Sequence, residues 1–149
     1  MTHMPRMALA AVLGLSVLTI GPAGAMRQSE GGGEVAFKPS RSSTDVPAGR
    51  STEIGFLAAF DKQACRRLRA NVRVNQPRHG TVRTTGASAS FTSGQVRTNK
   101  CAGRSIGGVK VIYTPDRGYR GADSFTINVS YRDGADRRVS TEGFHLNVR

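Results

Sequence analysis

The 149-residue chain carries 22 lysines and arginines against 10 aspartates and glutamates, so its formal net charge is +12. The length fits a single domain. The charge favours anionic partners and solubility and says nothing about the fold. Because no aromatic side chains alternate with the arginines to stack bases, the composition does not favour a nucleic-acid-binding protein.

Residues 1–25 have the pattern of a secretory signal peptide. A basic Arg6 precedes an apolar run over 7–20, a Gly-Pro pair ends that run, and the small residues at 23–25 supply a cleavage pattern. A buried N-terminal helix is the alternative. The run is too short for a membrane span, and no later apolar stretch is long enough. We therefore expect an exported protein, periplasmic or secreted, with no transmembrane segment after cleavage.

The segment after the cleavage pattern is rich in glycine, serine, proline and charge. Residues 26–49 include three consecutive glycines at 31–33, which are typical of a flexible segment. We expect a flexible N-terminal lead over 26–49, with a short strand at 35–37 as the alternative. The folded domain is then expected over 50–149.

The chain has two cysteines, Cys65 and Cys101. In an exported chain, an even pair of cysteines predicts a disulfide. Two free thiols, or half of a metal site, are the alternatives. A metal is poorly supported because His79 and His145 are isolated and no C-x-x-C motif occurs. We expect one disulfide, no metal and no cofactor.

Short strand-like segments alternate with turn signals from residue 51 onward, which predicts an all-β antiparallel sandwich. Apolar residues occupy every second position over 68–74 and again over 125–131, so each segment is expected to bury one face. One helical alternative remains. The apolar residues of 57–68 are spaced three or four apart, which also fits an amphipathic helix.

The C-terminal part is predicted to form a hairpin. The Asp-Gly pair at 133–134 can supply the positive φ of a tight turn. Alternate apolar residues of 144–148 share one face of the returning strand, whereas Val139 has the opposite parity. We therefore expect a β-bulge near 142–143.

Three segments carry a resemblance to a known family: NQPRHGTV at 75–82, VIYTPDRGYRGADSF at 111–125 and INVSYRDG at 127–134. Their pattern is P-x-H-G-x-V, then Y-x-P, then G-Y-x-G-x-D-x-F, then a strand closing on D-G. It resembles the bacterial immunoglobulin-like, cadherin-like modules of exported proteins, here as a single copy over about 50–149. The resemblance implies an immunoglobulin-like sandwich. Such modules serve adhesion, spacing and carbohydrate contact alike, so it implies no particular function.

The turn residues of these segments have physical roles that agree with such a fold. The prolines and glycines shape turns, end a strand and permit a tight corner, and the aspartate can accept backbone N–H bonds there. Tyr113 and Phe125 are expected in the core. The structural turn residues are Pro77, Gly80, Pro115, Gly118, Gly121 and Asp123.

Catalysis and calcium binding are both poorly supported. His79 lies in a turn, and His145 alternates with core residues, so neither belongs to a nucleophile–base constellation. Calcium needs six to eight oxygen ligands, and the arginines around the candidate aspartates oppose a cation. We expect a non-enzymatic protein in which the aspartates cap turns. The aspartates considered are Asp116, Asp123, Asp133 and Asp136.

The best functional signal is a set of arginines. Arg67, Arg69 and Arg73 share one strand parity, and Arg83 is expected to point outward beside the inward Val82. We expect these four arginines to form a basic stripe on one sheet. Guanidinium groups suit phosphate, sulfate and carboxylate. The alternative is an ordinary solvated surface.

The function expected from these features is an exported binding or interaction module with a basic surface. Its partner would be an anionic envelope glycan, a lipid headgroup or an envelope protein, and not nucleic acid. A second hypothesis is a secreted inhibitor or accessory subunit that acts through an exposed loop at 86–107. Binding through charge would weaken steeply with salt, whereas a loop seated in a groove would depend more on apolar contact.

Overall fold

The computed structural model describes residues 32–40, 44–97 and 99–149, so the predicted signal peptide lies outside the described residues. The described part is almost entirely strand, with one short 3-10 turn, η1 (Asn99–Cys101), and no α-helix. The strands are β1 (Gly33–Pro39), β2 (Asp45–Val46), β3 (Thr52–Asp61), β4 (Arg66–Arg67), β5 (Ala70–Asn75), β6 (Gly80–Ser90), β7 (Ser105–Pro115), β8 (Gly121–Asp133) and β9 (Asp136–Val148).

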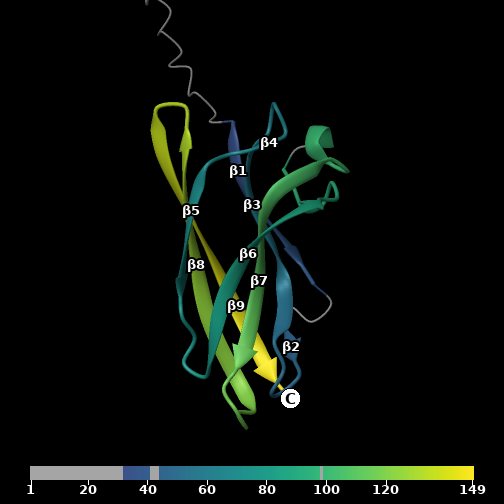
Figure 1. Cartoon of the computed structure of the whole chain (residues 1–149). Coiled ribbons are helices and arrows are strands. Elements are labelled where there is room, and N and C mark those ends of the chain that lie inside the picture. The colour runs from purple at the N-terminus through teal and green to yellow at the C-terminus, as the bar shows by residue number, and fades with distance from the viewer. Residues whose placement is uncertain (1–31, 41–43, 98) are drawn as a thin grey trace, which may run out of the picture.

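These strands form two sheets (Figure 1). Sheet A has the order β1-β3-β7-β6, with β4 pairing to β3, and sheet B has the order β2-β9-β8-β5. All strand pairs are antiparallel except the short parallel pair of β2 with β9. The predicted all-β sandwich with antiparallel sheets is confirmed.

The core lies between the two sheets, and a second apolar cluster covers the outer face of sheet A. β3 contributes to both, because Leu57 and Ala59 face sheet B while Phe56 and Phe60 pack under residues 91–106. Every residue of β3 from Ile54 to Phe60 is therefore buried. A strand buried on both faces reads as a continuous apolar run. The helical alternative for 57–68 is wrong for this reason.

The predicted flexible lead is a strand over much of its described length. β1 pairs with β3 from Gly33 to Pro39, and β2 pairs with the end of β9. A Cβ at Gly33 would lie 2.5 Å from a ring carbon of Tyr131, so glycine is required there for close packing. The domain boundary predicted at residue 50 falls inside the sandwich.

The predicted bulge near 142–143 is absent. β8 and β9 pair without a register shift from Gly121 opposite Val148 to Asp133 opposite Asp136. Val139 faces outward and is 63% exposed. The strand can therefore continue to the inward Phe144 without a bulge. The turn between the strands uses Gly134 at φ +62°, in the left-handed region that glycine tolerates.

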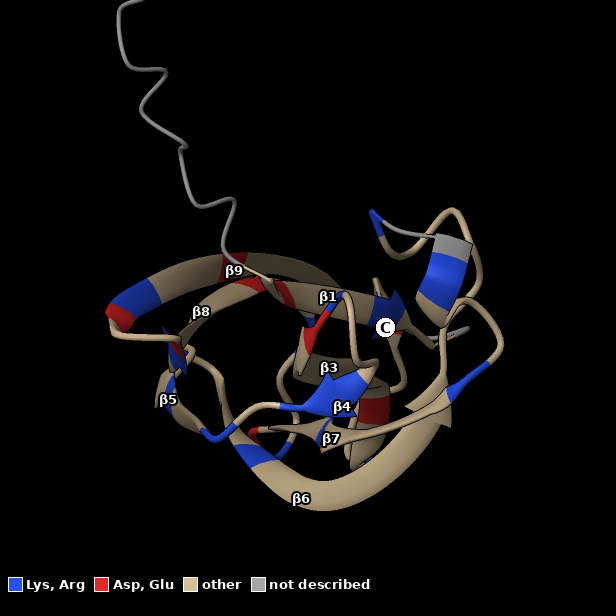
Figure 2. Ribbon diagram, turned by 90° about the horizontal axis from the view of Figure 1, so that it is seen from above, with Lys and Arg blue, Asp and Glu red and all other residues tan. Residues whose placement is uncertain are grey.

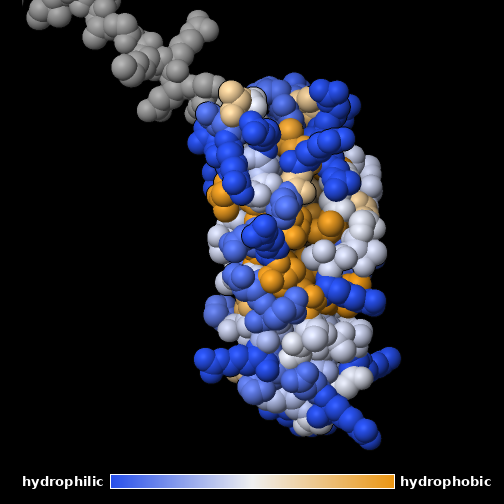
Figure 3. Space-filling model, turned by 60° about the vertical axis from the view of Figure 1, so that its left-hand side comes forward, coloured by the Kyte–Doolittle hydropathy of each residue, from blue (hydrophilic) through white to orange (hydrophobic). Residues whose placement is uncertain are grey.

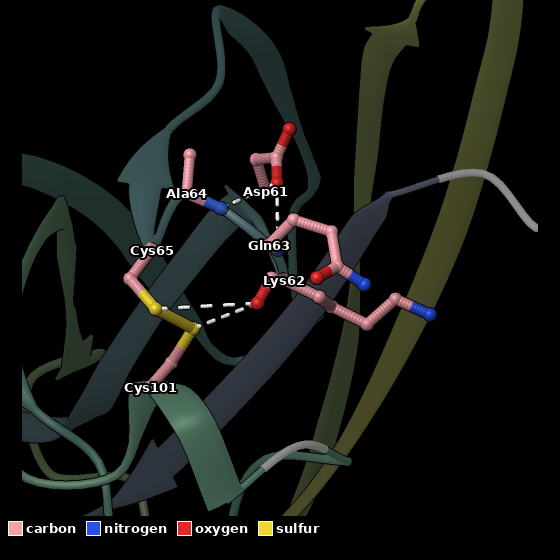
Figure 4. Close-up of a disulfide and its surroundings, with 6 residues drawn as sticks. All are labelled: Asp61, Lys62, Gln63, Ala64, Cys65 and Cys101. Carbon is pink, nitrogen blue, oxygen red and sulfur yellow. Dashed lines mark hydrogen bonds between the residues drawn. A yellow bond between two sulfur atoms is a disulfide. The ribbon is translucent and has the colours of Figure 1, made fainter.

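The predicted disulfide is confirmed between Cys65 and Cys101, whose Cα atoms are 5.3 Å apart (Figure 4). Cys65 ends a tight turn in which Oδ1 of Asp61 accepts bonds from the backbone N–H groups of Gln63 (2.7 Å) and Ala64 (2.9 Å). These two bonds stabilise the charged carboxylate and hold the pKa of Asp61 below its usual value. The disulfide ties this turn to η1.

The range 86–107 is a loop only in part. Its first residues belong to β6 and its last to β7, so the connection itself spans only residues 91–104. Within that connection Phe91, Val96 and Cys101 are buried against the outer face of sheet A. These buried side chains anchor the connection on sheet A, whereas Thr92 and Arg104 remain exposed, so the inhibitor hypothesis stays a prediction.

Candidate functional site

The turn motif is a structural hub at one end of the sandwich, built around the buried carboxylate of Asp123. Its Oδ1 accepts bonds from the backbone N–H groups of Ser124 (2.9 Å) and Arg78 (3.3 Å). Its Oδ2 accepts bonds from the N–H of His79 (3.2 Å) and the hydroxyl of Tyr113 (2.9 Å). Two of the four donors come from the 76–79 turn, so Asp123 joins distant segments.

Tyr113 links the same segments from inside the core. Its hydroxyl lies 3.1 Å from the carbonyl oxygen of His79 as well as 2.9 Å from Asp123. Burial, followed by the hydrogen bond to the Asp123 carboxylate, raises the pKa of Tyr113 well above its usual value. The hydroxyl therefore stays protonated as a donor.

The remaining turn residues lie at the same end. Gly118 (φ +78°) lies in the corner before β8, Gly121 (φ +131°) begins β8, and Pro115 ends β7. A Cβ at Gly80 would lie 2.5 Å from the carbonyl oxygen of Thr114, so the strand approaches too closely for any side chain there. Pro77 lies in the connection between β5 and β6. The structure gives these residues local roles in shaping the backbone.

Two histidines lie beside this hub. The His79 ring stacks on Tyr119 with centroids 4.1 Å apart, and His145 pairs across the sheet with Ser124. Both line an open hollow of about 700 Å³. In the described residues, no group of three or more histidine, cysteine, aspartate or glutamate side chains is placed to hold a metal ion.

The four arginines predicted as one stripe are divided between the sheets. Arg73 lies on β5 in sheet B, whereas Arg83 lies on β6 in sheet A and Arg67 on β4, which pairs with β3. The chain crosses from one sheet to the other between β5 and β6. Strand parity predicts which side chains point outward, but it does not reveal such a crossing.

Two of the predicted arginines nevertheless lie together, with two that the sequence reasoning missed. Arg67 and Arg69 line an open groove of about 930 Å³ with Arg132 and Arg137, and we call this the arginine groove. Asn71, Ser130 and Tyr131 complete its polar lining. The missed pair flanks the β8–β9 turn at 134–135, and two residues at equal distances from a hairpin turn pair across the strands.

Three of these arginines come from neighbouring segments, and we call them the arginine row. Arg132 pairs directly with Arg137 across β8 and β9, and Arg69 immediately precedes Ala70, the first residue of β5, which pairs with Tyr131. Neighbouring strands lie about 4.8 Å apart, so the Arg132 and Arg137 side chains are close together. Such a row of like charges is unfavourable without an anion nearby.

No carboxylate of the described residues pairs with the arginine groove. The ion pairs found among the described residues lie outside the groove. They join Lys110 to Glu53, Arg138 to Asp136 and Arg149 to Asp45. Asp133 accepts a bond from the N–H of Gly33, so the acids near the hairpin have other partners. Figure 2 shows lysine and arginine on β4, on β5 and at the β8–β9 hairpin. The groove is therefore electropositive.

Tyr131 lies half-buried between the groove and the core. Its hydroxyl donates to the carbonyl oxygen of Gly33 at 3.3 Å. Burial, followed by the nearby charge of Asp133, raises the pKa of Tyr131. Figure 3 shows strongly hydrophilic side chains gathered on the upper part of this side of the molecule, with apolar side chains visible below them.

Comparisons with protein-family models, with curated proteins and with solved structures found no match to this chain. Among the described residues, no helix has the length and apolar character needed to cross a membrane. What the geometry defines is an all-β sandwich with one disulfide, a buried structural hub at one end and an electropositive groove at the other.

Proposed function

We propose that this protein is a non-enzymatic, exported binding module that holds anionic groups in the arginine groove. One observation carries the proposal. Four exposed arginines on three chain segments line a single groove, and no carboxylate of the described residues pairs with them. The positive potential of an open cluster of unpaired cations makes the electrostatic free energy of binding an anion favourable.

The side chains suit phosphate, sulfate or carboxylate. Guanidinium groups present planar pairs of N–H donors that match two oxygens of such an anion. Asn71 and Ser130 add neutral hydrogen-bonding groups beside the arginines. The proposed partners are anionic glycans or lipid headgroups of an envelope, or an envelope protein with an acidic surface.

Two features support export to the periplasm or beyond. The residues at 1–25 have the order of charge, apolar run and small residues that signal peptidases recognise. The disulfide between Cys65 and Cys101 is a bond that persists in oxidising compartments. A single immunoglobulin-like module of the exported type remains part of this proposal, on the motifs at 75–82 and 111–134.

The proposal is tested by elution from a column of immobilised heparin, a sulfated polysaccharide. The Arg132→Gln/Arg137→Gln variant loses two charges in the groove, and Arg83→Gln/Arg117→Gln loses two exposed charges elsewhere. We expect the groove variant to elute at clearly lower salt than the control variant, with both melting within a few degrees of the parent. Equal elution of the two variants would show that the groove is ordinary solvated surface.

A further inference from the structure

On the premise of the proposed function, we infer that the outer face of sheet B is a platform for a linear acidic polysaccharide. Acidic groups of the polymer bind the arginine row, and its hydroxyl groups bind neutral polar side chains further along the strands. The inference rests on the side chains that the strand register brings to this face.

The outward residues form successive rows across β5, β8 and β9. After the arginine row, each next row has one residue from each strand, and neutral hydrogen-bonding side chains predominate. The outward residues of these three strands, from Asn71 to Asn75, from Ser124 to Arg132 and from Arg137 to His145, include no aspartate or glutamate. The rows are Asn71–Ser130–Val139, Arg73–Asn128–Thr141 and Asn75–Thr126–Gly143.

The positive charges on this face are spaced along the strands. Arg73 lies level with Asn128 on β8, and Arg132 lies four residues further along that strand on the same side, which corresponds to about 13 Å of extended chain. The Asn71–Ser130 row lies between them. A ligand that satisfies both charges must therefore be elongated, with anionic groups separated by parts that accept and donate neutral hydrogen bonds.

Several neutral groups are held in place before any ligand binds. The Asn75 amide nitrogen donates to the Thr126 hydroxyl at 2.7 Å, and the Thr141 hydroxyl donates to the Asn128 amide oxygen at 2.7 Å. The Asn128 amide nitrogen remains a donor for a ligand. Side chains that are already ordered lose less entropy on binding. Sugar hydroxyl groups, which both donate and accept, match such a surface.

The same residues argue against other anionic partners. A membrane surface would be met by apolar side chains that insert between headgroups, but Val139 is the one large apolar residue found exposed in the described part of the chain. A compact polyphosphate would use the arginines and leave the neutral rows without partners. No phenylalanine or tyrosine lies outward on these strands, so affinity for a polysaccharide depends on repeated contacts along it.

The test compares three probes: polygalacturonate, which is linear and carries one carboxylate per sugar, inorganic polyphosphate, and phosphatidylglycerol vesicles. The Asn75→Ala/Asn128→Ala variant changes the neutral rows outside the arginine groove, and Thr81→Ala/Thr85→Ala changes two exposed polar residues on β6 of sheet A as the control. We expect the neutral-row variant to bind polygalacturonate about tenfold more weakly than the parent and to bind polyphosphate unchanged. The control variant should match the parent with both probes, and melting temperatures establish folding.

The outcomes separate this inference from the proposed function. If Arg132→Gln/Arg137→Gln loses binding to both polymers while the neutral-row variant loses neither, the groove binds anions and the polysaccharide platform is wrong. If the parent binds phosphatidylglycerol vesicles and ignores polygalacturonate, the ligand is a lipid surface and the inference is overturned. If the arginine variant binds every probe like the parent, the proposed function fails as well.

Discussion

Asp123 shows how a single residue can determine the geometry of one end of the sandwich. Its carboxylate is buried and accepts four bonds from backbone and tyrosine donors. Replacement by alanine leaves those donors in a buried site without acceptors. We expect Asp123→Ala to lower the free energy of unfolding by about 2–4 kcal/mol, measured by urea denaturation. A loss below about 0.5 kcal/mol, which is typical of surface substitutions, would contradict this role.

Tyr113 makes the free energy of unfolding depend on pH in the alkaline range. Because burial and Asp123 raise its pKa, the folded protein keeps a proton that the unfolded chain releases above pH about 10. The free energy of unfolding therefore falls as the pH rises beyond that value. Tyr113→Phe should be less stable at pH 7 by about 1–3 kcal/mol, but should lose stability less steeply above pH 10. Denaturant titrations at pH 7, 9 and 11 test this, and parallel curves for variant and parent would contradict it.

The role of Asp123 illustrates what single-residue reasoning can supply. An aspartate in a glycine-rich corner predicts a side chain that accepts backbone N–H bonds, and Asp123 does accept them. The sequence did not reveal that two of these donors are in residues 78–79, about 45 positions earlier. Such a contact depends on how β5, β6 and β8 assemble, and turn propensity carries no information about that.

At the scale of elements, the strand patterns were predictable wherever one face is buried and the other is exposed. β8 alternates in this way, with Phe125, Ile127 and Val129 buried. β3 does not alternate, because the connection at 91–104 covers its outer face. The sequence could not show this cover, since the apolar residues of 91–104 are few and far apart. For the same reason the sequence did not show that Phe91, Val96 and Cys101 of this connection are buried.

The disulfide holds this connection against sheet A. In Cys65→Ser/Cys101→Ser, the apolar contacts of Phe91 and Val96 remain but the covalent tie is lost. We expect the variant to be about 2–4 kcal/mol less stable, following other small disulfide-bonded domains. Amide hydrogens of 91–104 should lose more protection than those of β8 and β9, whose protection falls only with the global stability. Equal loss of protection in both sheets would show that the bond stabilises the whole sandwich and has no local role.

At the scale of the whole molecule, the two ends of the sandwich have different roles. The hub around Asp123 is buried and has its polar groups paired, whereas the arginine groove is open and its charges are unpaired within the described residues. Half of this groove was predictable, since Arg67 and Arg69 were identified from parity. Arg132 and Arg137 were missed because they lie far from Arg69 in the sequence, on β8 and β9, and only the assembled sheet brings these strands beside β5.

The central claim is that the four arginines act together on one anion. The most direct measurement is a titration with tripolyphosphate monitored by NMR at the arginine side-chain Nε–H signals. We expect the signals of Arg67, Arg69, Arg132 and Arg137 to shift together with one dissociation constant, while those of Arg83 and Arg117 stay in place. Shifts of similar size at all the exposed arginines, including Arg83 and Arg117, would contradict the existence of a binding site in the groove.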